Sequence, residues 1–249
     1  MTTILNAPLA AVAATPHVAG TYVVGCYVLL LGSAAWTWFR LERGNWDELG
    51  ASLKPGRARQ AGVGLLVGLL SLAGLLGIEL QAGLLSLTAP SQPLWPGVLP
   101  WVGLACLFAA SEECLFRGFI YRMLRRGMGA WGSATVSAAL YAVAHVLKAD
   151  VLSAPPWLPL LGLALAGLFL ARLTERLGHF WGAAGIHAGW LALFIPLDQL
   201  RCLVAPSEYV GLTGGGYPLG GALGMACVLA LWWGSHHWWT PNAPGEKVG

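Results

Sequence analysis

Residues 106–117 read CLFAASEECLFR, and in this stretch Glu112 and Glu113 stand side by side within a segment that is otherwise apolar enough to span a membrane. A carboxylate in the hydrocarbon region of a bilayer is energetically unfavourable even on lenient insertion scales. Two adjacent carboxylates therefore need partners and a task. Two histidines in other apolar segments, His145 and His187, are the candidate partners.

The composition is typical of a polytopic membrane protein. Of the 249 residues, 57% are hydrophobic and 10% are charged, with a mean hydropathy of +0.65, whereas soluble domains carry about 25% charged residues. The net charge of +3 is too small to indicate nucleic-acid binding. The five cysteines form no CxxC or Cys/His cluster, so neither a disulfide framework nor a structural zinc site is indicated.

The hydropathy pattern predicts an all-α fold, a polytopic membrane helical bundle with about seven transmembrane helices. We expect one integral-membrane domain over residues 1–249, with a motif core over about 97–197. The expected spans are 18–39, 61–83, 97–124, 129–148, 156–172, 179–197 and 215–234. The glycine pattern Gly64-x-x-x-Gly68 in the second span favours close helix packing.

The basic residues predict the orientation in the membrane. All but two of the 14 Lys and Arg fall in one set of alternate loops and in the C-terminal tail, and the other set holds only Lys148 and Arg201. By the positive-inside rule, the N-terminus is outside and the C-terminus is cytoplasmic. We therefore expect a multi-pass protein of the bacterial inner (plasma) membrane.

Spacing along the third span suggests different roles for its two glutamates. Glu113 and Arg117 are four residues apart, so they share a helical face and can form an ion pair. Glu112 is turned about 100° away by the helical period. Burial disfavours the charged form of a carboxyl without a cationic partner, which suits Glu112 to take a proton from water near neutral pH.

Position along the chain predicts that the two histidines lie near Glu112. Glu112 and His145 are at similar distances before and after the charged turn at Gly127. An antiparallel helical hairpin therefore brings them to similar depth. His187 lies lower, within the scatter of helix starts and tilts. The three converge in one cavity if the third, fourth and sixth spans are neighbours.

Each polar residue also has a plainer interpretation. A single histidine in a membrane helix is often a packing residue with one hydrogen bond, and a Glu-Glu-x-x-x-Arg sequence can be an interfacial charge cluster. We interpret Glu79 and Asp198 as interface residues because they lie at the ends of spans. The histidines at membrane edges are given no catalytic role, and they are His17, His179, His236 and His237.

These motifs resemble those of the CPBP intramembrane proteases, the CAAX-protease and bacteriocin-processing family, also called Abi. The run from Glu112 to Arg117 is similar to the family motif EExxxR. Tyr141 and His145 form YxxxH, where the family has FxxxH. His187 and Leu191 match HxxxN with the asparagine lost. The sequence WDELG at residues 46–50 also resembles the family's lead-in to its second helix.

The resemblance implies a glutamic-type intramembrane endopeptidase that hydrolyses a peptide bond near the C-terminus or the membrane-proximal part of a protein. Family members include the prenyl-protein endopeptidase of CAAX proteins, and bacterial members process bacteriocins, confer immunity or cleave C-terminal sorting tails. The expected partners are the bilayer and a protein or peptide substrate, either prenylated or carrying a sorting tail. No nucleic acid is expected.

The roles that follow are a hypothesis. Glu112 is the general base that activates a water, and His145 helps to hold that water. The ion pair of Glu113 and Arg117 fixes the helix, and His187 donates to the oxyanion. Two further candidates for substrate or oxyanion contacts are Tyr141 and Trp190, of which Trp190 carries an indole donor near the position of the missing asparagine. Packing is the simpler role for Trp190.

Two alternatives stay open at the level of the sequence. One concerns metal: no cofactor is expected, but Glu112, His145 and His187 are also a plausible Zn²⁺ ligand set. The other concerns catalysis: Leu191 makes a non-catalytic family member credible, acting in bacteriocin immunity, binding or transport. The absence of an internal repeat disfavours a transporter.

Overall fold

The computed structural model describes residue 25 and residues 28–90, 94–146, 157–215 and 217–238. Some residues used in the sequence predictions lie outside this range, namely His17, Lys148 and the C-terminal tail. The chain divides into two compact units, Met1–Asn45 and Trp46–Gly249. The single integral-membrane domain expected over residues 1–249 stays a prediction.

The first unit contributes one apolar helix, Val28–Leu41. Its last turn, η1 (Thr37–Leu41), is wound as a π-helix. Trp38 is 3% exposed, and its indole N–H donates to the carbonyl of Asn45 at 3.1 Å. The chain after the helix is thereby folded back onto its end.

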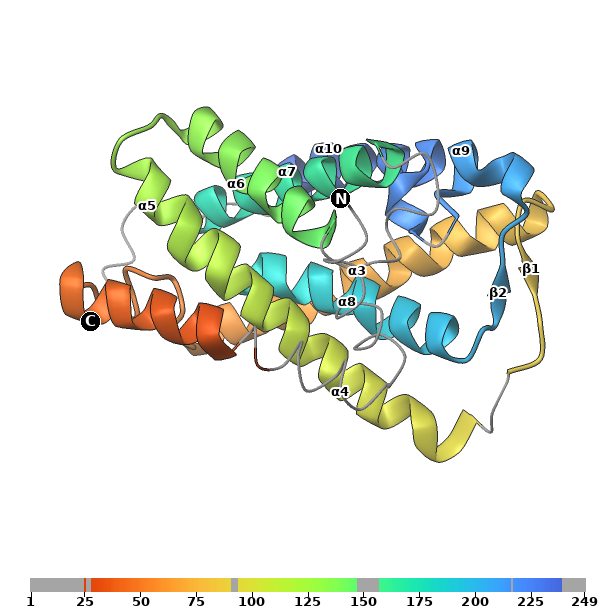
Figure 1. Ribbon diagram of the computed structural model, residues 1–249, viewed down its shortest axis with the longest axis horizontal. Helices are drawn as coiled ribbons and strands as arrows, with labels where there is room; N and C mark the ends of the chain where they lie inside the picture. Colours follow the sequence, from red (N-terminus) through yellow and green to blue (C-terminus); the bar gives the residue numbers. More distant parts are fainter. Residues whose placement is uncertain (1–24, 26–27, 91–93, 147–156, 216, 239–249) are drawn as a thin grey trace, which may run out of the picture. The chain divides into compact units, whose positions relative to one another are not determined.

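The described part of the second unit is a helical bundle with one short two-stranded sheet, whose strands are far apart in the chain (Figure 1). Its elements in chain order are α3 (Pro55–Gln81), β1 (Ser86–Leu87), α4 (Leu94–Glu113), η2 (Cys114–Ile120), α5 (Tyr121–Arg125), α6 (Ala130–Val146), α7 (Trp157–Leu177), α8 (Trp181–Gln199), β2 (Leu203–Val204), η4 (Ser207–Tyr209), α9 (Val210–Thr213), η5 (Pro218–Gly220) and α10 (Ala222–Trp238). The strands pair antiparallel, with Ser86 opposite Val204.

Among the residues that the structure describes, three helices are long and apolar enough to cross a membrane, namely Pro55–Gln81, Val98–Arg125 and Trp157–Leu177. They confirm the second, third and fifth predicted spans as membrane-capable helices. Two of the other helices, α6 and α10, have 17 residues each, which is at the short end of the range that spans a bilayer. In α8, His187, Pro196 and Asp198 dilute the apolar sequence. Crossing by these helices stays a prediction.

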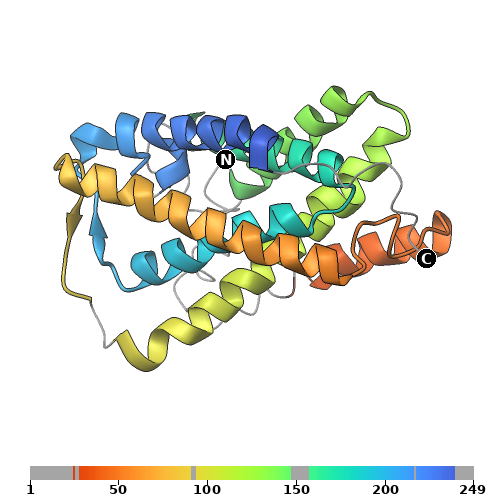
Figure 2. The same cartoon turned by 180° about the vertical axis from the view of Figure 1, so that it is seen from behind.

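The tightest packing in the bundle joins α3 and α8, which lies between α3 and α4 (Figures 1 and 2). A Cβ atom at Gly64 would lie 2.5 Å from the carbonyl oxygen of Gly182, and one at Gly68 would lie 2.2 Å from that of Ile186. The contact is reciprocal, since a Cβ atom at Gly185 would lie 2.1 Å from the carbonyl oxygen of Ala61. Small residues thus allow backbone-to-backbone contact, as Gly64-x-x-x-Gly68 predicted.

The remaining helices complete the second unit around this pair. Helix α7 packs against α6, and α10 packs against α7 and α3. The main hydrophobic core gathers side chains from α3, α7, α8 and α10, and among them are Leu72, Phe169, Ile186 and Val228. The two strands join the ends of α3 and α8, which run in the same direction (Figure 1).

The start of α8 is held by His179 and by the loop that precedes α3. The backbone N–H of Trp181 donates to Nδ1 of His179 at 3.2 Å, so this nitrogen must be unprotonated. The indole N–H of Trp181 donates to the carbonyl of Ala51 at 3.1 Å. In the same loop Asp47 pairs with Lys54 at 3.2 Å and with Arg57 at 3.0 Å. His179 thus has a structural role at the end of a helix.

The first prediction concerns the α3–α8 contact. Gly68→Ala places a methyl group against a backbone oxygen that cannot move alone, so we expect a loss of about 1–3 kcal/mol in the free energy of unfolding, as for an overpacked core. Gly74→Ala in the same helix is the matched control, because a Cβ atom there meets nothing within 4 Å. Thermal unfolding in detergent measures both variants. Equal melting temperatures would contradict the contact.

The second prediction concerns pH. Burial, followed by the charges of Arg57 and Arg122, lowers the pKa of His179 from 6.5 to about 4. As pH falls below 6.5, the unfolded chain therefore binds a proton that the folded chain does not, and stability falls until the pH approaches 4. Asparagine accepts the same hydrogen bond without titrating. We expect the melting temperature of His179→Asn to depend less on pH between 6.5 and 4 than that of the wild type.

Candidate active site

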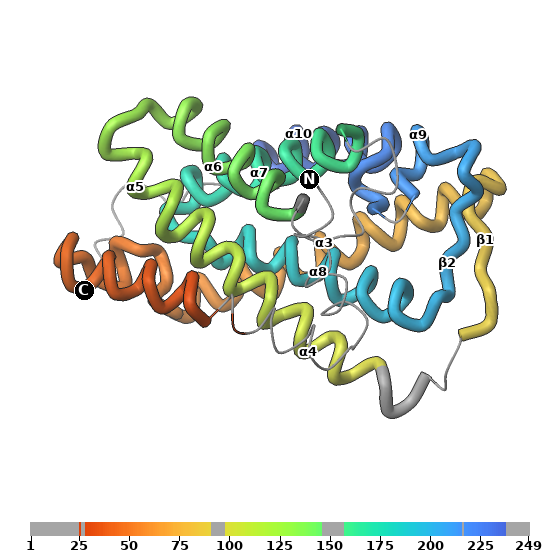
Figure 3. The backbone as a smooth tube through the Cα atoms, in the orientation of Figure 1, coloured from red at the N-terminus to blue at the C-terminus, as the bar shows by residue number. Residues whose placement is uncertain are grey.

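The paired glutamates end α4, at a point where the helix changes its winding. The seven residues of η2 that follow Glu113 form a π-helix, and the backbone continues into α5 as one path (Figure 3). The wider winding changes the carbonyl partners, and the carbonyl of Phe116 accepts a hydrogen bond from the Ser137 hydroxyl on α6 at 2.9 Å. Single π turns inside α-helices often occur at functional sites. Glu112 is 3% exposed and Glu113 is fully buried.

Glu113 is paired with Arg117, as its spacing predicted. The Arg117 guanidinium, itself 0% exposed, donates to Oε1 of Glu113 at 2.8 Å. A second N–H donates to the carbonyl of Gly167 on α7 at 3.1 Å. The guanidinium carbon also lies 4.5 Å from the ring centroid of Tyr141, within the range of a cation–π contact. One side chain thus connects η2, α6 and α7.

The same carboxylate oxygen orients His187. Nδ1 of His187 lies 3.0 Å from Oε1 of Glu113. Because a guanidinium N–H of Arg117 already donates to this oxygen, the oxygen is an acceptor and Nδ1 must carry the proton. The other ring nitrogen, Nε2, then points toward Glu112 and lies 3.8 Å from its Oε2. A carboxylate behind an imidazole fixes both the tautomer and the orientation of the ring.

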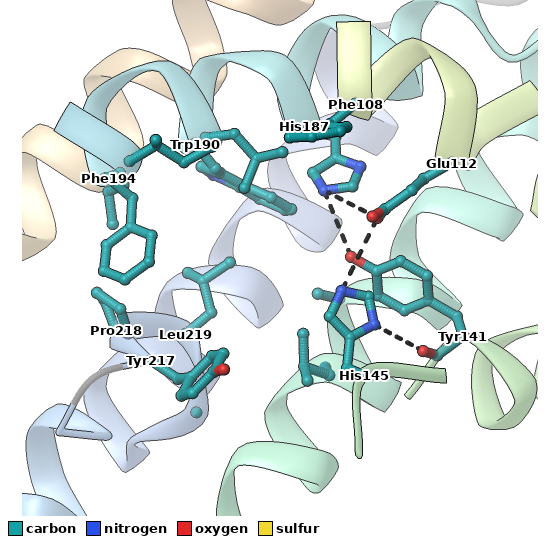
Figure 4. A pocket seen from close by; sticks show the side chains of 16 residues that line it. Phe108, Glu112, Tyr141, His145, His187, Trp190, Phe194, Tyr217, Pro218 and Leu219 are labelled. Atoms are coloured by element: carbon teal, nitrogen blue, oxygen red, sulfur yellow. Dashed lines mark hydrogen bonds and ion pairs between the residues drawn. The ribbon is translucent and has the colours of Figure 1, made fainter. Parts of the chain in front are cut away.

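His145 is oriented in the same way by a backbone group. Its Nδ1 lies 2.8 Å from the carbonyl oxygen of Tyr141, one turn earlier on α6. A carbonyl oxygen only accepts, so Nδ1 carries the proton and Nε2 of the neutral ring offers a lone pair. That Nε2 is 3.8 Å from Oε2 of Glu112. Figure 4 shows Glu112 between the two rings.

A cavity of about 270 Å³ opens in front of these groups. Its polar rim carries Glu112, His145, His187 and the side chain of Tyr141, and its walls are mostly apolar (Figure 4). The apolar wall contains Phe108 from α4, Leu163 and Ala166 from α7, Phe194 from α8, and Pro218, Leu219 and Gly220 from η5. The cavity therefore combines a small polar cluster with a surface suited to an apolar ligand.

Three residues of this cavity bear on the motif departures seen in the sequence. The Tyr141 hydroxyl lies 3.4 Å from Nε2 of His187, so the tyrosine in place of phenylalanine puts a donor into the polar cluster. Leu191 lines the cavity at the position of the missing asparagine. The indole N–H of Trp190 donates to the Ser71 hydroxyl at 3.1 Å, which favours the packing role for Trp190.

The structure therefore brings together all five residues singled out by the motifs. Glu112, His145 and His187 converge, and Glu113 with Arg117 lies directly behind them. Sequence reasoning did not identify the backbone acceptor at Gly167 or the η5 wall, for which the sequence carries no signal. The pattern Gly185-x-x-x-Gly189 around His187 was a usable signal for α3–α8 packing.

The donor set is of a kind that Zn²⁺ accepts, because two imidazole nitrogens and a carboxylate face one another with their Nδ1 protons engaged elsewhere. Among the described residues, however, no group of three His, Cys, Asp or Glu side chains has the spacing of a metal site. A metal bound here would draw on Glu112, His145 and His187 after a shift of their side chains.

Comparison with known proteins adds one family. Residues 93–193 match the family described as type II CAAX prenyl endopeptidase Rce1-like. This region contains α4, η2, α5, α6, α7 and most of α8, and with them every residue of the polar cluster. No curated protein and no solved structure matches. The match confirms the resemblance to the CAAX-protease family and indicates a peptidase.

The third prediction tests the buried ion pair. Arg117→Met leaves the Glu113 carboxylate without its guanidinium in a fully buried site, and breaking such a pair costs about 3–5 kcal/mol. We expect a large fall in melting temperature in detergent. In Glu113→Gln/Arg117→Met no charge is left behind, so we expect part of the lost stability to return. A double variant that unfolds below Arg117→Met would contradict a compensated charge pair.

Proposed function

We propose that this member of the CAAX-protease family is an intramembrane endopeptidase that uses Glu112 to activate water. The observation that carries the proposal is the convergence of Glu112 Oε2 with Nε2 of His145 and Nε2 of His187, each at 3.8 Å, at the rim of a mostly apolar cavity. The separation leaves the carboxylate able to receive a water hydrogen bond while both imidazoles remain fixed from behind.

The proposed chemistry follows from these orientations. A water donates to Glu112, and the lone pair on Nε2 of His145 accepts its second hydrogen. Glu112 takes a proton as the water oxygen attacks the peptide carbonyl carbon. The tetrahedral intermediate collapses when the C–N bond breaks and Glu112 returns the proton to the leaving amine nitrogen. The products are a carboxylic acid, which keeps the second hydrogen of the water, and a free amine, so atoms and protons balance.

Two groups are placed to stabilise the oxyanion. His187 can donate from Nε2 when it is protonated, and the Glu113 carboxylate at Nδ1 stabilises that imidazolium. The Tyr141 hydroxyl is the second donor, 3.4 Å from the same nitrogen. Since Leu191 cannot donate, Tyr141 supplies the hydrogen bond that the missing asparagine gives in the family motif.

The walls of the cavity favour a substrate with an apolar segment next to the scissile bond. Apolar side chains make most of its lining, and burying such surface releases about 25 cal/mol per Å² of apolar area. A prenylated chain and a hydrophobic C-terminal tail both meet this requirement. The matched family is described as acting on prenylated CAAX proteins.

The alternative function rests on Leu191. If the asparagine is essential, the chain binds its protein partner without cutting it, as an immunity or binding protein would. In that case the apolar cavity and the Glu113–Arg117 ion pair would serve only to bind the protein partner. Cleavage by the purified chain separates the two.

The fourth prediction is a cleavage assay with purified chain in detergent and synthetic peptides that carry a farnesyl-cysteine CAAX end or an apolar C-terminal tail. Glu112→Gln removes the base while keeping the shape, so we expect turnover to fall by at least about 100-fold, at the low end of what general acid–base catalysis contributes. Tyr141→Phe removes one oxyanion donor, for which the expected loss in kcat is about 100- to 1000-fold.

The control is Glu208→Gln, which removes an exposed carboxylate outside the cavity and should leave turnover unchanged. A chelator is added in a parallel reaction. The proposed chemistry expects unchanged turnover, and inhibition reversed by Zn²⁺ would instead assign the polar cluster to a metal. No cleavage by wild type, with peptide binding intact, would favour the non-enzyme.

A further inference from the structure

A second buried carboxylate lies outside the polar cluster, on the last turns of α3. Glu79 is 0% exposed. Neither of its carboxylate oxygens has a hydrogen-bond partner among the residues that the structure describes. The sequence placed Glu79 at the membrane interface, and the structure adds that its side chain is enclosed within the second unit. An isolated carboxylate in such a site is unfavourable unless something binds it.

Glu79 lines a cavity of about 190 Å³. Asp198, from the last turn of α8, lines the same cavity, and so does Thr213 of α9. The described lining residues include no Lys, Arg or His. The Thr213 hydroxyl is already used, since it donates to the Tyr209 carbonyl at 3.2 Å and accepts from the Gly215 N–H at 3.3 Å. The described lining of the cavity is therefore acidic, and a bound cation would offset its negative charge.

The cavity adjoins the candidate active site. Phe194 and Pro218 line both cavities, so the two share a wall. Along α3, Glu79 lies eleven residues beyond Gly68, which packs against Ile186 next to His187. At 1.5 Å per residue this is a rise of roughly 16 Å. An extended peptide covers that distance with about five residues at 3.3–3.6 Å each.

The size and ligands of the cavity favour an organic cation over a metal ion. Calcium takes about 6–8 oxygen ligands at close range, and no group of three metal-ligating side chains exists among the described residues. A guanidinium or ammonium group needs space and one or two carboxylates, with which it forms charge-assisted hydrogen bonds. Glu79 and Asp198 supply these.

We propose that the Glu79 cavity is a specificity subsite that binds a lysine or arginine side chain of the substrate, about five residues from the scissile bond. The proposal rests on the proposed peptidase function and adds a substrate requirement to it. The substrate then combines an apolar segment in the main cavity with a basic residue at the end of the bundle where β1 and β2 lie.

The test uses synthetic peptides with one shared apolar segment, in which a single residue at successive positions is Arg, Gln or Glu. Cleavage sites and kcat/KM are measured by mass spectrometry with wild-type chain in detergent. We expect the peptide with Arg about five residues from the cleaved bond to exceed its Gln counterpart about 10- to 100-fold, the range for a hydrogen bond to a charged group. Glu79→Gln should abolish this preference, so that the Arg and Gln peptides are cleaved with similar kcat/KM.

The matched control is Glu208→Gln, which should keep the preference. Asp198→Asn, at an exposed position of the same cavity, should reduce it and serves as the second variant if Glu79→Gln does not fold. Cleavage without a preference for Arg, or a preference that survives in folded Glu79→Gln, would overturn the subsite while leaving the peptidase function standing.

A binding measurement separates failure of the subsite from failure of the peptidase function. In Glu112→Gln, the affinities for the Arg and Gln peptides are compared with and without Glu79→Gln. If the Arg peptide binds more tightly than the Gln peptide, and this difference is lost when Glu79→Gln is added, the subsite is supported even if the wild type cleaves nothing. Equal affinities in that case overturn it.

Discussion

The carboxylate of Glu113 is the point on which the arrangement of the site depends. Its Oε1 accepts from Arg117 at 2.8 Å and from Nδ1 of His187 at 3.0 Å. The first bond holds the carboxylate in place, and the second fixes the proton of His187 on Nδ1, away from Glu112. A buried ion pair adds little net stability, so its main effect here is to hold the carboxylate that orients the imidazole of His187.

This interaction requires α8 to lie very close to its neighbours. Glycines at 64, 68 and 185 let the backbones of α3 and α8 touch, and α8 also packs against α4. His187 therefore lies on a helix that packs between α3 and α4, and α4 carries Glu112 and Glu113. The hydrogen bond between His187 and Glu113 therefore depends on the glycine contacts, because a wider α3–α8 spacing would move His187 relative to Glu113.

The sequence predicted much of this and missed the rest for identifiable reasons. Helical segments and the Glu113–Arg117 pair follow from hydropathy and from spacing four, which are local properties. The π winding of η2 and the acceptor at Gly167 do not, because they depend on contacts with α6 and α7. The enclosure of Glu79 was not predicted, because β2 and α9 come from far along the chain to surround it.

The two departures from the family motifs involve one physical quantity, the number of hydrogen-bond donors at the cavity. Leucine at 191 removes a donor, and tyrosine at 141 adds one on the facing helix, 3.4 Å from His187. Both side chains line the same space, so the donor count is preserved while its direction changes. Tyr141 also stacks its ring under the Arg117 guanidinium, which restrains the hydroxyl. In the proposed mechanism, a donor held in this way would need little reorganisation as negative charge develops on the substrate oxygen.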